Sequence, residues 1–378
     1  MKKTAAFLLT VMIILSLASC GSGGKGSSSA TQKPTESTTE ETEVKANIVT
    51  DSGAAKELLE ELETQNFGGV LYAEKNGKPF ASYTNGTLTG DVPITLDTPL
   101  PIASVSKQFC AAAIMLLEER GKLSVDDKLS DYFPECGYGD KITLHNMLCM
   151  RSGIPNFNSK ISEDTVSIDN TDEENTKIVL DWVFNEDLDF EPDEMYEYSN
   201  LNYILLGNII EKVTGEKYID FLRKNIFEPL EMNHSGSVTE LKDNPEWAKS
   251  FSYKNEDIGL GIEPGVSKGA GDLISNAEDM TKWMNALPSG KIISKESFKK
   301  MSTNYSSGSE HYGYALSTNM KGSAGHFGSI GKFNSCDYFS TSENFTLFIV
   351  TNTAGGNTLK SKCYSLVPDL IRAADEKS

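Results

Sequence analysis

A serine and a lysine three residues apart are the sharpest chemical feature of this sequence. Ser104 and Lys107 open a long apolar segment, 105–120, which is expected to be a helix closed by Gly121. Residues three apart at the start of a helix share one face, so the lysine amine can reach the serine hydroxyl. A serine hydroxyl becomes a nucleophile when a neighbouring base takes its proton, and partial burial favours a neutral amine. The spacing therefore indicates acyl transfer, with Ser106 as the competing serine; an N-cap serine followed by a surface lysine is the alternative.

Tyr198 and Asn200 form a second candidate pair, directly before a helix expected to begin at Leu201. Tyr198 could act as a base or proton relay if a nearby ammonium lowered the pKa of its hydroxyl. Asn200 could hydrogen-bond a substrate amide. The alternative is a packing tyrosine followed by an asparagine that caps the helix.

A third candidate is the stretch Gly325-His326-Phe327-Gly328. Glycines allow a substrate backbone to approach a strand closely, and His326 would place a hydrogen-bond donor or a positive charge at the cleft. The alternative is a turn with an exposed histidine. The four histidines show no metal-like spacing, so neither a metal nor an organic cofactor is expected.

Apolar runs near both ends of the chain predict the strands of one sheet. Residues 69–74 and 79–83 are joined across Asn76-Gly77, which is a strong hairpin signal. A second group of strands is expected near the C-terminus, in residues 311–320, 333–340 and 345–352. Helices are expected over 54–64 and 359–374.

Between the two groups of strands, from about 120 to 290, the chain is expected to be mostly helical. Helices are predicted over 143–150, over 201–213 before Gly215, and over 280–287 after a capping box at 275–278. The pattern predicts an α/β (α+β) fold: an antiparallel sheet built from both chain ends and flanked by helices, with an inserted helical region. A ligand is expected in a cleft between the two regions.

The N-terminus has the pattern of an exported protein. Two lysines precede the apolar run 5–17, which is short for a membrane span and typical of a secretory signal. The small residues before Cys20 resemble a bacterial lipoprotein signal, which implies lipidation of Cys20 and an extracytoplasmic, membrane-anchored protein. We expect a signal peptide at 1–20, a disordered polar tether at 21–51 and a folded domain at 52–378. An ordinary signal peptide with a coincidental cysteine is the alternative.

The net charge and the cysteines argue against a nucleic-acid partner and against a disulfide-rich fold. The formal net charge is −19, so nucleic acid is not an expected partner because its phosphates would be repelled. The remaining five cysteines are odd in number and widely spaced, which does not indicate a disulfide framework. They are Cys110, Cys136, Cys149, Cys336 and Cys363.

Together the three motifs resemble the penicillin-recognising serine hydrolases, which comprise class C β-lactamases, D-alanyl-D-alanine carboxypeptidases and related esterases. Four further stretches agree with this resemblance: 142–148, 151–155, 229–232 and 271–275. It implies a β-lactamase/transpeptidase-like fold. It also implies that Ser104 is acylated, Lys107 is its base partner, Tyr198 relays a proton, and Asn200, His326 and Gly328 contact substrate.

The resemblance further implies an oxyanion hole, formed by the backbone N–H of Ser104 and one on the C-terminal strands, expected near Asn334 or Ser335. One departure is that His-Phe-Gly at 326–328 replaces the family's Lys-Thr-Gly. The permanent ammonium that would hold a substrate carboxylate is therefore missing, and His326 is largely neutral at pH 7 unless a carboxylate raises its pKa.

The expected function is hydrolysis of amide or ester bonds through an acyl-enzyme. The expected substrates are D-amino-acid-containing cell-wall peptides or β-lactam-like molecules. The alternatives are a small-ester carboxylesterase and a non-catalytic envelope binding protein that retains the fold.

Overall fold

The computed structural model describes most of the chain from Lys45 onward. The backbone is described for residues 45–87, 92–156, 166–167, 170–240, 265–306, 310–318, 322–331, 333–352 and 356–376, and side chains after 352 are described from 365. Cys20 and the predicted signal peptide lie outside the described residues. Val44–Ser378 form one compact unit.

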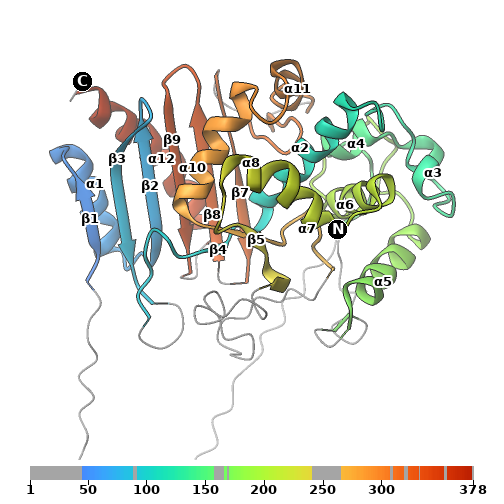
Figure 1. The fold of residues 1–378 in the computed structure, drawn as a ribbon, viewed down its shortest axis with the longest axis horizontal. Coiled ribbons are helices and arrows are strands. Elements are labelled where there is room, and N and C mark those ends of the chain that lie inside the picture. The colour runs from blue at the N-terminus through green and yellow to red at the C-terminus, as the bar shows by residue number, and fades with distance from the viewer. Residues whose placement is uncertain are drawn as a thin grey trace, which may run out of the picture. The chain divides into compact units, whose positions relative to one another are not determined.

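A six-stranded antiparallel sheet joins the two ends of the folded chain, as predicted (Figure 1). The strands in spatial order are β1 (Asn47–Thr50), β3 (Lys78–Asn85), β2 (Gly69–Lys75), β9 (Phe345–Thr351), β8 (Phe333–Ser340) and β7 (Ser323–Ile330). The central strand β9 is buried at every position, because both of its faces are covered.

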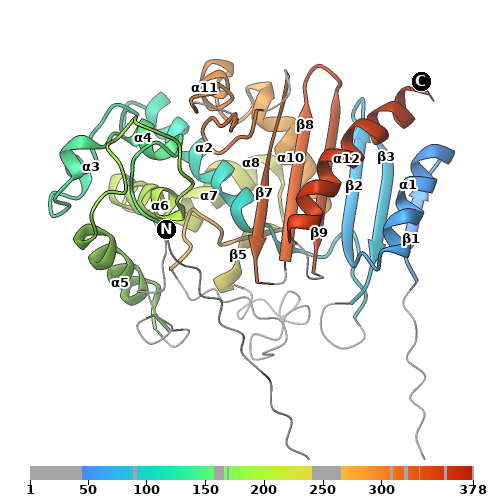
Figure 2. The same ribbon diagram turned by 180° about the vertical axis from the view of Figure 1, so that it is seen from behind.

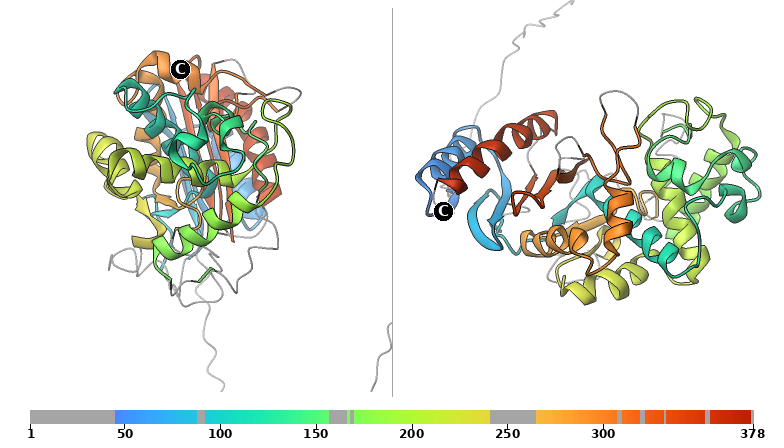
Figure 3. Two further views of the ribbon diagram at one scale, coloured as in Figure 1. Left: turned by 90° about the vertical axis from the view of Figure 1, so that its right-hand side faces the viewer. Right: turned by 90° about the horizontal axis from the view of Figure 1, so that it is seen from above.

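Helices cover both faces of this sheet. On one face α1 (Gly53–Thr64) and α12 (Gly356–Asp375) lie together, as the views in Figures 2 and 3 show. Leu59 of α1 and Leu370 of α12 pack there against Leu71, Leu347 and other inward side chains. The opposite face packs against α10 (Ala277–Ala286). Because side chains alternate along a strand, neighbouring residues of β9 enter the two separate cores.

Three predicted elements differ from the structure. The folded unit begins before Ser52, because β1 lies inside the segment 21–51 predicted as a tether and pairs with β3. No named strand lies in the described part of 311–320, where the chain makes only isolated bridges at Tyr312 and Ser317. The strand of this region is instead β7, whose glycines resemble a turn in sequence.

The region between the strand groups is largely helical, as predicted. Its helices are α2 (Ser106–Glu119), α3 (Leu129–Tyr132), α4 (Leu144–Leu148), α5 (Asp172–Asn185), α6 (Asn200–Thr214), α7 (Tyr218–Leu222) and α8 (Glu228–Leu230), and α11 (Lys295–Met301) follows α10. Gly215 closes α6 in the left-handed conformation. In Figure 1 most of these helices lie to one side of the sheet.

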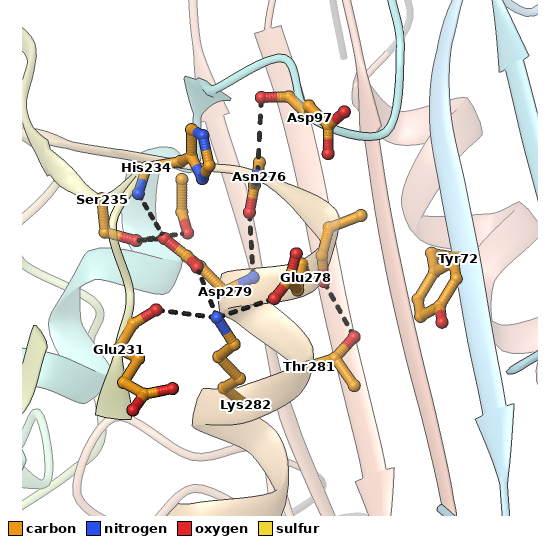
Figure 4. Close-up of polar contacts among 12 residues, drawn as sticks. Tyr72, Asp97, Glu231, His234, Ser235, Asn276, Glu278, Asp279, Thr281 and Lys282 are labelled. Atoms are coloured by element: carbon orange, nitrogen blue, oxygen red, sulfur yellow. Dashed lines mark hydrogen bonds and ion pairs between the residues drawn. The ribbon is translucent and has the colours of Figure 1, made fainter. Parts of the chain in front are cut away.

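A small second sheet positions the segment that carries Ser104. Its order is β4 (Leu100–Pro101), β6 (Leu273–Ser275) and β5 (Gly236–Ser237). β6 leads directly into α10, and buried Asp279 at the start of α10 accepts hydrogen bonds from the His234 N–H and the Ser235 hydroxyl (Figure 4). Lys282 forms an ion pair with Asp279. These contacts fix β6 and, through it, β4.

The predicted capping box at 275–278 is wrong by one residue. Asn276 caps α10 by accepting from the Asp279 N–H at 2.9 Å, while Ser275 ends β6 and bonds Ser235 instead. Pairing with β4 holds Ser275 in the sheet, so the next residue becomes the cap.

Candidate active site

Ser104 lies at the start of a continuous helical segment. It belongs to a short 3-10 turn, Ala103–Val105, that runs into α2. Ala103 has a φ of 46°, a left-handed conformation that is strained for a residue with a side chain. The N–H groups of a first helical turn have no partner within the helix, so the Ser104 N–H is available to bind an oxygen.

The two serines of the motif have different environments. Ser104 is partly exposed, whereas Ser106 is fully buried and its hydroxyl accepts a hydrogen bond from the Leu273 N–H at 3.2 Å. Ser106 therefore holds β6 against α2. Of the two serines, only Ser104 is accessible to a substrate, and its role as the nucleophile stays a prediction.

Lys107 is completely buried, and its amine contacts three oxygens. The Nζ atom lies 3.1 Å from Ser104 Oγ, 2.8 Å from Asn200 Oδ1 and 2.6 Å from the Ala270 carbonyl oxygen. The two carbonyl-type oxygens only accept hydrogen bonds. A neutral amine that donates its two protons to them directs its lone pair at the Ser104 hydroxyl.

Burial also favours that neutral amine. It lowers the pKa of Lys107 from 10.5 to about 7, although Cys110 and Asp272 nearby oppose part of the shift. A base whose pKa lies near the working pH is well matched to proton transfer. The structure therefore excludes the alternative of a surface lysine.

Tyr198 lies beside this pair, with its ring centroid 5.0 Å from Lys107 Nζ. Burial raises the pKa of its hydroxyl, while the adjacent Ser104 opposes part of the rise. Among the described residues, the hydroxyl has no hydrogen-bond partner of ordinary geometry. The condition for Tyr198 to act as a base, a pKa lowered by a nearby ammonium, is therefore not met, because burial outweighs the opposing effect. The protonated hydroxyl remains suited to relay a proton.

Asn200 begins α6, and its side chain contacts Lys107. Its Oδ1 accepts from Lys107, and its backbone N–H donates to Asn156 Oδ1 at 3.0 Å. The Asn200 Nδ2 lies 3.4 Å from the same Asn156 oxygen. Asn156 and the Ala270 carbonyl were both missed in the sequence, although each lies next to a stretch that agrees with the resemblance, 151–155 and 271–275.

His326 lies on β7 with only 6% of its surface exposed. Its Nδ1 is 2.7 Å from the Phe327 carbonyl oxygen, and its Nε2 is 2.9 Å from the Tyr312 hydroxyl. The alternative of an exposed histidine in a turn is thus wrong, because β7 pairs with β8 over its whole length. Tyr312 gave no signal in the sequence.

Gly328 lies directly against the Ser104 segment. A Cβ atom at this position would lie 2.5 Å from the Ile102 oxygen, 2.6 Å from Ser335 Oγ and 2.8 Å from the Ser104 nitrogen. Glycine is therefore required for β7 to approach the nucleophile. The sequence predicted that a substrate backbone approaches the strand here, whereas the close neighbour of Gly328 in the structure is the Ser104 segment.

We expect Gly328→Ala to lower kcat/KM by about 100-fold or more, because a shift near 1 Å between β7 and Ser104 is enough for such a loss. Gly53→Ala is the matched control, since a Cβ there meets nothing within 4 Å. Steady-state kinetics and the melting temperatures of both variants test this. Full activity in Gly328→Ala would contradict it.

Asn334 and Ser335 do not fit the predicted role in the oxyanion hole. Both lie on β8, an inner strand that pairs with β7 along one edge and with β9 along the other. The Ser335 hydroxyl donates to the Ile102 carbonyl at 2.6 Å, so it fixes the backbone before Ser104. An oxyanion donor from this sheet must come from the edge strand β7.

A buried polar network lies next to the site. Trp283 Nε1 donates to Gln108 Oε1, and Gln108 Nε2 donates to both carboxylate oxygens of Asp337. The His326 N–H donates to the same carboxylate at 2.7 Å. Gln108 follows Lys107 in the chain, so the network ties the nucleophile's helix to β7. Burial raises the pKa of Asp337 to about 7.

The described residues show neither a membrane span nor a metal site. They contain no helix long and apolar enough to cross a membrane. They also contain no group of three or more metal-binding side chains. The four cysteines with described side chains (Cys110, Cys136, Cys149 and Cys336) are free thiols.

Comparison with known proteins identifies the family. A family model described as Beta-lactamase matches residues 53–368, and the chain belongs to this family. It is a serine hydrolase with the β-lactamase-like fold, an antiparallel sheet with helices on both faces.

Bacterial relatives agree with this assignment. One relative is PbpX of Bacillus subtilis, whose name describes it as a candidate penicillin-binding protein. It is 30% identical to this chain over 278 residues, which are 71% of this chain and 67% of PbpX. Protein flp of Staphylococcus aureus is 27% identical over 314 residues, which are 75% of this chain. The match spans 59% of flp, about three fifths of its length.

A solved structure also resembles the chain. The D-amino acid amidase of Ochrobactrum anthropi SV3, complexed with L-phenylalanine, has a TM-score of 0.70 at 25% identity and covers 86% of this chain and 98% of its own. A penicillin-binding protein of Bacillus halodurans has the same TM-score at 23% identity, covering 85% and 100%, and supports the fold alone.

Proposed function

We propose that this protein hydrolyses amide or ester bonds through an acyl-enzyme on Ser104. The observation that carries the proposal is the buried amine of Lys107, which donates to two carbonyl-type oxygens and directs its remaining lone pair at the Ser104 hydroxyl. A site that only binds a ligand does not need a buried amine directed at a serine hydroxyl. A buried base beside a partly exposed serine is what nucleophilic catalysis requires.

In the first step, the Ser104 oxygen attacks the carbonyl carbon and its proton passes to Lys107. The tetrahedral intermediate then collapses, the bond to the leaving group breaks, and the leaving group takes a proton. Tyr198 is placed to relay that proton, because its protonated hydroxyl lies beside Ser104 and its ring lies against Lys107. Water then attacks the acyl carbon and gives a proton to Lys107. The bond between the acyl carbon and the Ser104 oxygen breaks, the acid is released, and Lys107 returns the proton to Ser104.

The oxyanion hole would combine the N–H groups of Ser104 and Ser329. The Gly325 carbonyl accepts from the Ser317 N–H, so Gly325 directs its backbone groups away from β8. Backbone groups alternate in direction along an antiparallel strand, and the register of β7 with β8 is unbroken. Ser329 therefore directs its N–H to the same free edge, next to Gly328 and the Ser104 nitrogen.

The proposed substrates are acyl donors built from D-amino acids. The support is the similarity to a D-amino acid amidase and to relatives named as penicillin-binding proteins. Amides, esters and peptides of a bacterial cell wall belong to this class, and β-lactams mimic it.

A panel of substrates tests this proposal. The parent and Ser104→Ala are assayed on D- and L-phenylalanine amide, N-acetyl-D-alanyl-D-alanine, a penicillin and p-nitrophenyl acetate. We expect turnover that depends on Ser104 and favours the D-enantiomer of the amide. Turnover equal in Ser104→Ala on every substrate would refute an acyl-serine mechanism.

We also propose that the protein is exported and anchored to a membrane by a lipid on Cys20. The support is the order of basic residues, apolar run and small residues before Cys20, followed by a polar segment. Attachment to a membrane surface fits a substrate in the cell envelope.

We expect the full-length protein to fractionate with membranes and to incorporate labelled palmitate when expressed in a bacterium. Cys20→Ser should lose the label and leave the membrane fraction, because one acylated cysteine carries the anchor. Unchanged fractionation and labelling of Cys20→Ser would contradict the anchor and would leave the catalytic proposal unaffected.

A further inference from the structure

The position that carries a lysine in the related Lys-Thr-Gly motif holds a histidine with both ring nitrogens engaged. His326 Nδ1 lies 2.7 Å from the Phe327 carbonyl oxygen, which can only accept a hydrogen bond. This nitrogen therefore carries a proton. Nε2 lies 2.9 Å from the hydroxyl of Tyr312, which can donate or accept. In a neutral ring, Nε2 accepts and Tyr312 donates.

Tyr312 is itself held in place. It is 4% exposed, its N–H donates to Asn304 Oδ1 at 3.1 Å, and its carbonyl accepts from the Tyr305 N–H. Its ring contacts Tyr196 at a centroid distance of 5.5 Å. A hydroxyl fixed in this way keeps His326 in one orientation with Nε2 occupied.

We propose that Tyr312 is a specificity-determining positioning residue, which holds His326 in one orientation with Nε2 occupied, so that the site selects substrates without a carboxylate next to the scissile bond. The proposal rests on the acyl-serine function proposed above. Amides and esters whose leaving side ends in an uncharged group would be accepted. Substrates that end there in a free carboxylate would lack a cation to receive it.

Among the described residues, the other titratable groups around this pair do not supply that cation. Tyr196 and Tyr198 face Tyr312 from the segment before α6, with Tyr198 also 6.2 Å from the His326 ring by centroid distance. From β8, Asp337 accepts the His326 N–H. Lys107, on α2, faces Tyr198 and is the proposed base. The described titratable groups next to His326 are therefore the Asp337 carboxyl and the tyrosine hydroxyls.

The test uses two thioesters that differ only at the end of the leaving group. N-benzoyl-D-alanyl thioglycolate ends in a carboxylate, and the matched compound ends in a carboxamide. The ratio of kcat/KM for the two is measured at pH 6 and pH 8. We expect the parent to favour the carboxamide at both pH values.

Tyr312→Phe removes the hydroxyl at Nε2, so that a protonated ring can donate from this nitrogen to the carboxylate. We expect the preference for the carboxamide to fall about tenfold at pH 6 and little at pH 8, the size of one charge-assisted hydrogen bond. Asp337 is present in both proteins, so its titration does not produce the difference.

Tyr314→Phe is the matched control, because the Tyr314 hydroxyl bonds a different histidine, His145 Nδ1, at 2.6 Å. It should keep the parent's ratio. His326→Lys provides a second test that does not depend on Tyr312: the permanent ammonium should lower the preference at both pH values.

The outcomes separate this inference from the function on which it rests. If Ser104→Ala hydrolyses both thioesters as fast as the parent, the acyl-serine function and the inference fall together. If turnover depends on Ser104 but Tyr312→Phe keeps the parent's ratio at pH 6, the inference alone is overturned. An unchanged ratio in His326→Lys would also overturn it.

Discussion

Ser104→Ala is expected to lower kcat/KM for every accepted ester and amide by about 10⁴-fold or more, the scale of loss when a nucleophile that works together with its base is removed. The remaining rate would reflect binding and the oxyanion donors alone. The fold should persist, because Ser104 is partly exposed and its partner Lys107 keeps its hydrogen bonds to Asn200 and Ala270. Steady-state kinetics on the substrate panel, with melting temperatures, measure both effects.

Ser106→Ala is the matched control for this result. Its hydroxyl accepts from the buried Leu273 N–H, so the variant should lose about 1–3 kcal/mol of stability while retaining most of its activity. A loss of activity in Ser106→Ala as large as that in Ser104→Ala would contradict the assignment of the nucleophile.

Lys107→Met is expected to lower kcat/KM by about 10²–10⁴-fold, the usual contribution of a general base. In the parent, kcat/KM should rise with pH through about 7, because the amine must be neutral to take the serine proton and burial lowers its pKa to about 7. Rates measured from pH 5 to 9 test this. A parent profile that falls through this range would contradict Lys107 as the base.

The same lysine affects the free energy of unfolding. Its pKa is about 7 in the folded protein and near 10.5 when unperturbed, so between these values the unfolded chain binds more protons. Stability from this group should therefore rise with pH across that window in the parent, and this part of the rise should be absent from Lys107→Met. Denaturant titrations at pH 7 and 9 measure it. Asp272 and Asp337 also titrate near pH 7 but remain in both proteins.

The local part of the site could be predicted from sequence because it depends on helix geometry. Ser104 and Lys107 are three residues apart at the start of α2, and the structure brings their side chains to 3.1 Å. Asn200 was recognised as a site residue, although its contact with Lys107 joins residues 93 positions apart. The resemblance of three ordered motifs placed Asn200 in the site as a substrate ligand, but its hydrogen bond to Lys107 was not predicted.

The contacts missed in the sequence are those made by the backbone or by loops. The Ala270 carbonyl has no side-chain signal, and Tyr312 belongs to a segment predicted as a strand. β7 was difficult to recognise because its glycines, required where Gly325 and Gly328 approach neighbouring backbone, are typical of turns. Tertiary packing, and not local preference, makes this segment a strand.

The direction of the Tyr198 pKa shift also depends on tertiary packing and could not be predicted from the local sequence. The sequence places a lysine and a tyrosine in one site, which suggested an ammonium that lowers the tyrosine pKa. Burial acts on both groups instead: it lowers the pKa of Lys107 and raises that of Tyr198. The extent of burial depends on the whole fold, so the direction of the shift could not be read from the motif.

The central claim is that Ser104 is the nucleophile, and intact-protein mass spectrometry after reaction with a fluorophosphonate tests it most directly. The chain from Lys45 onward is prepared as the parent, Ser104→Ala and Ser106→Ala. Each protein is reacted with the fluorophosphonate and, separately, with a penicillin. We predict one fluorophosphonate adduct per chain in the parent and in Ser106→Ala, and none in Ser104→Ala. An adduct that persists in Ser104→Ala, or no adduct in the parent with either reagent, would contradict the assignment.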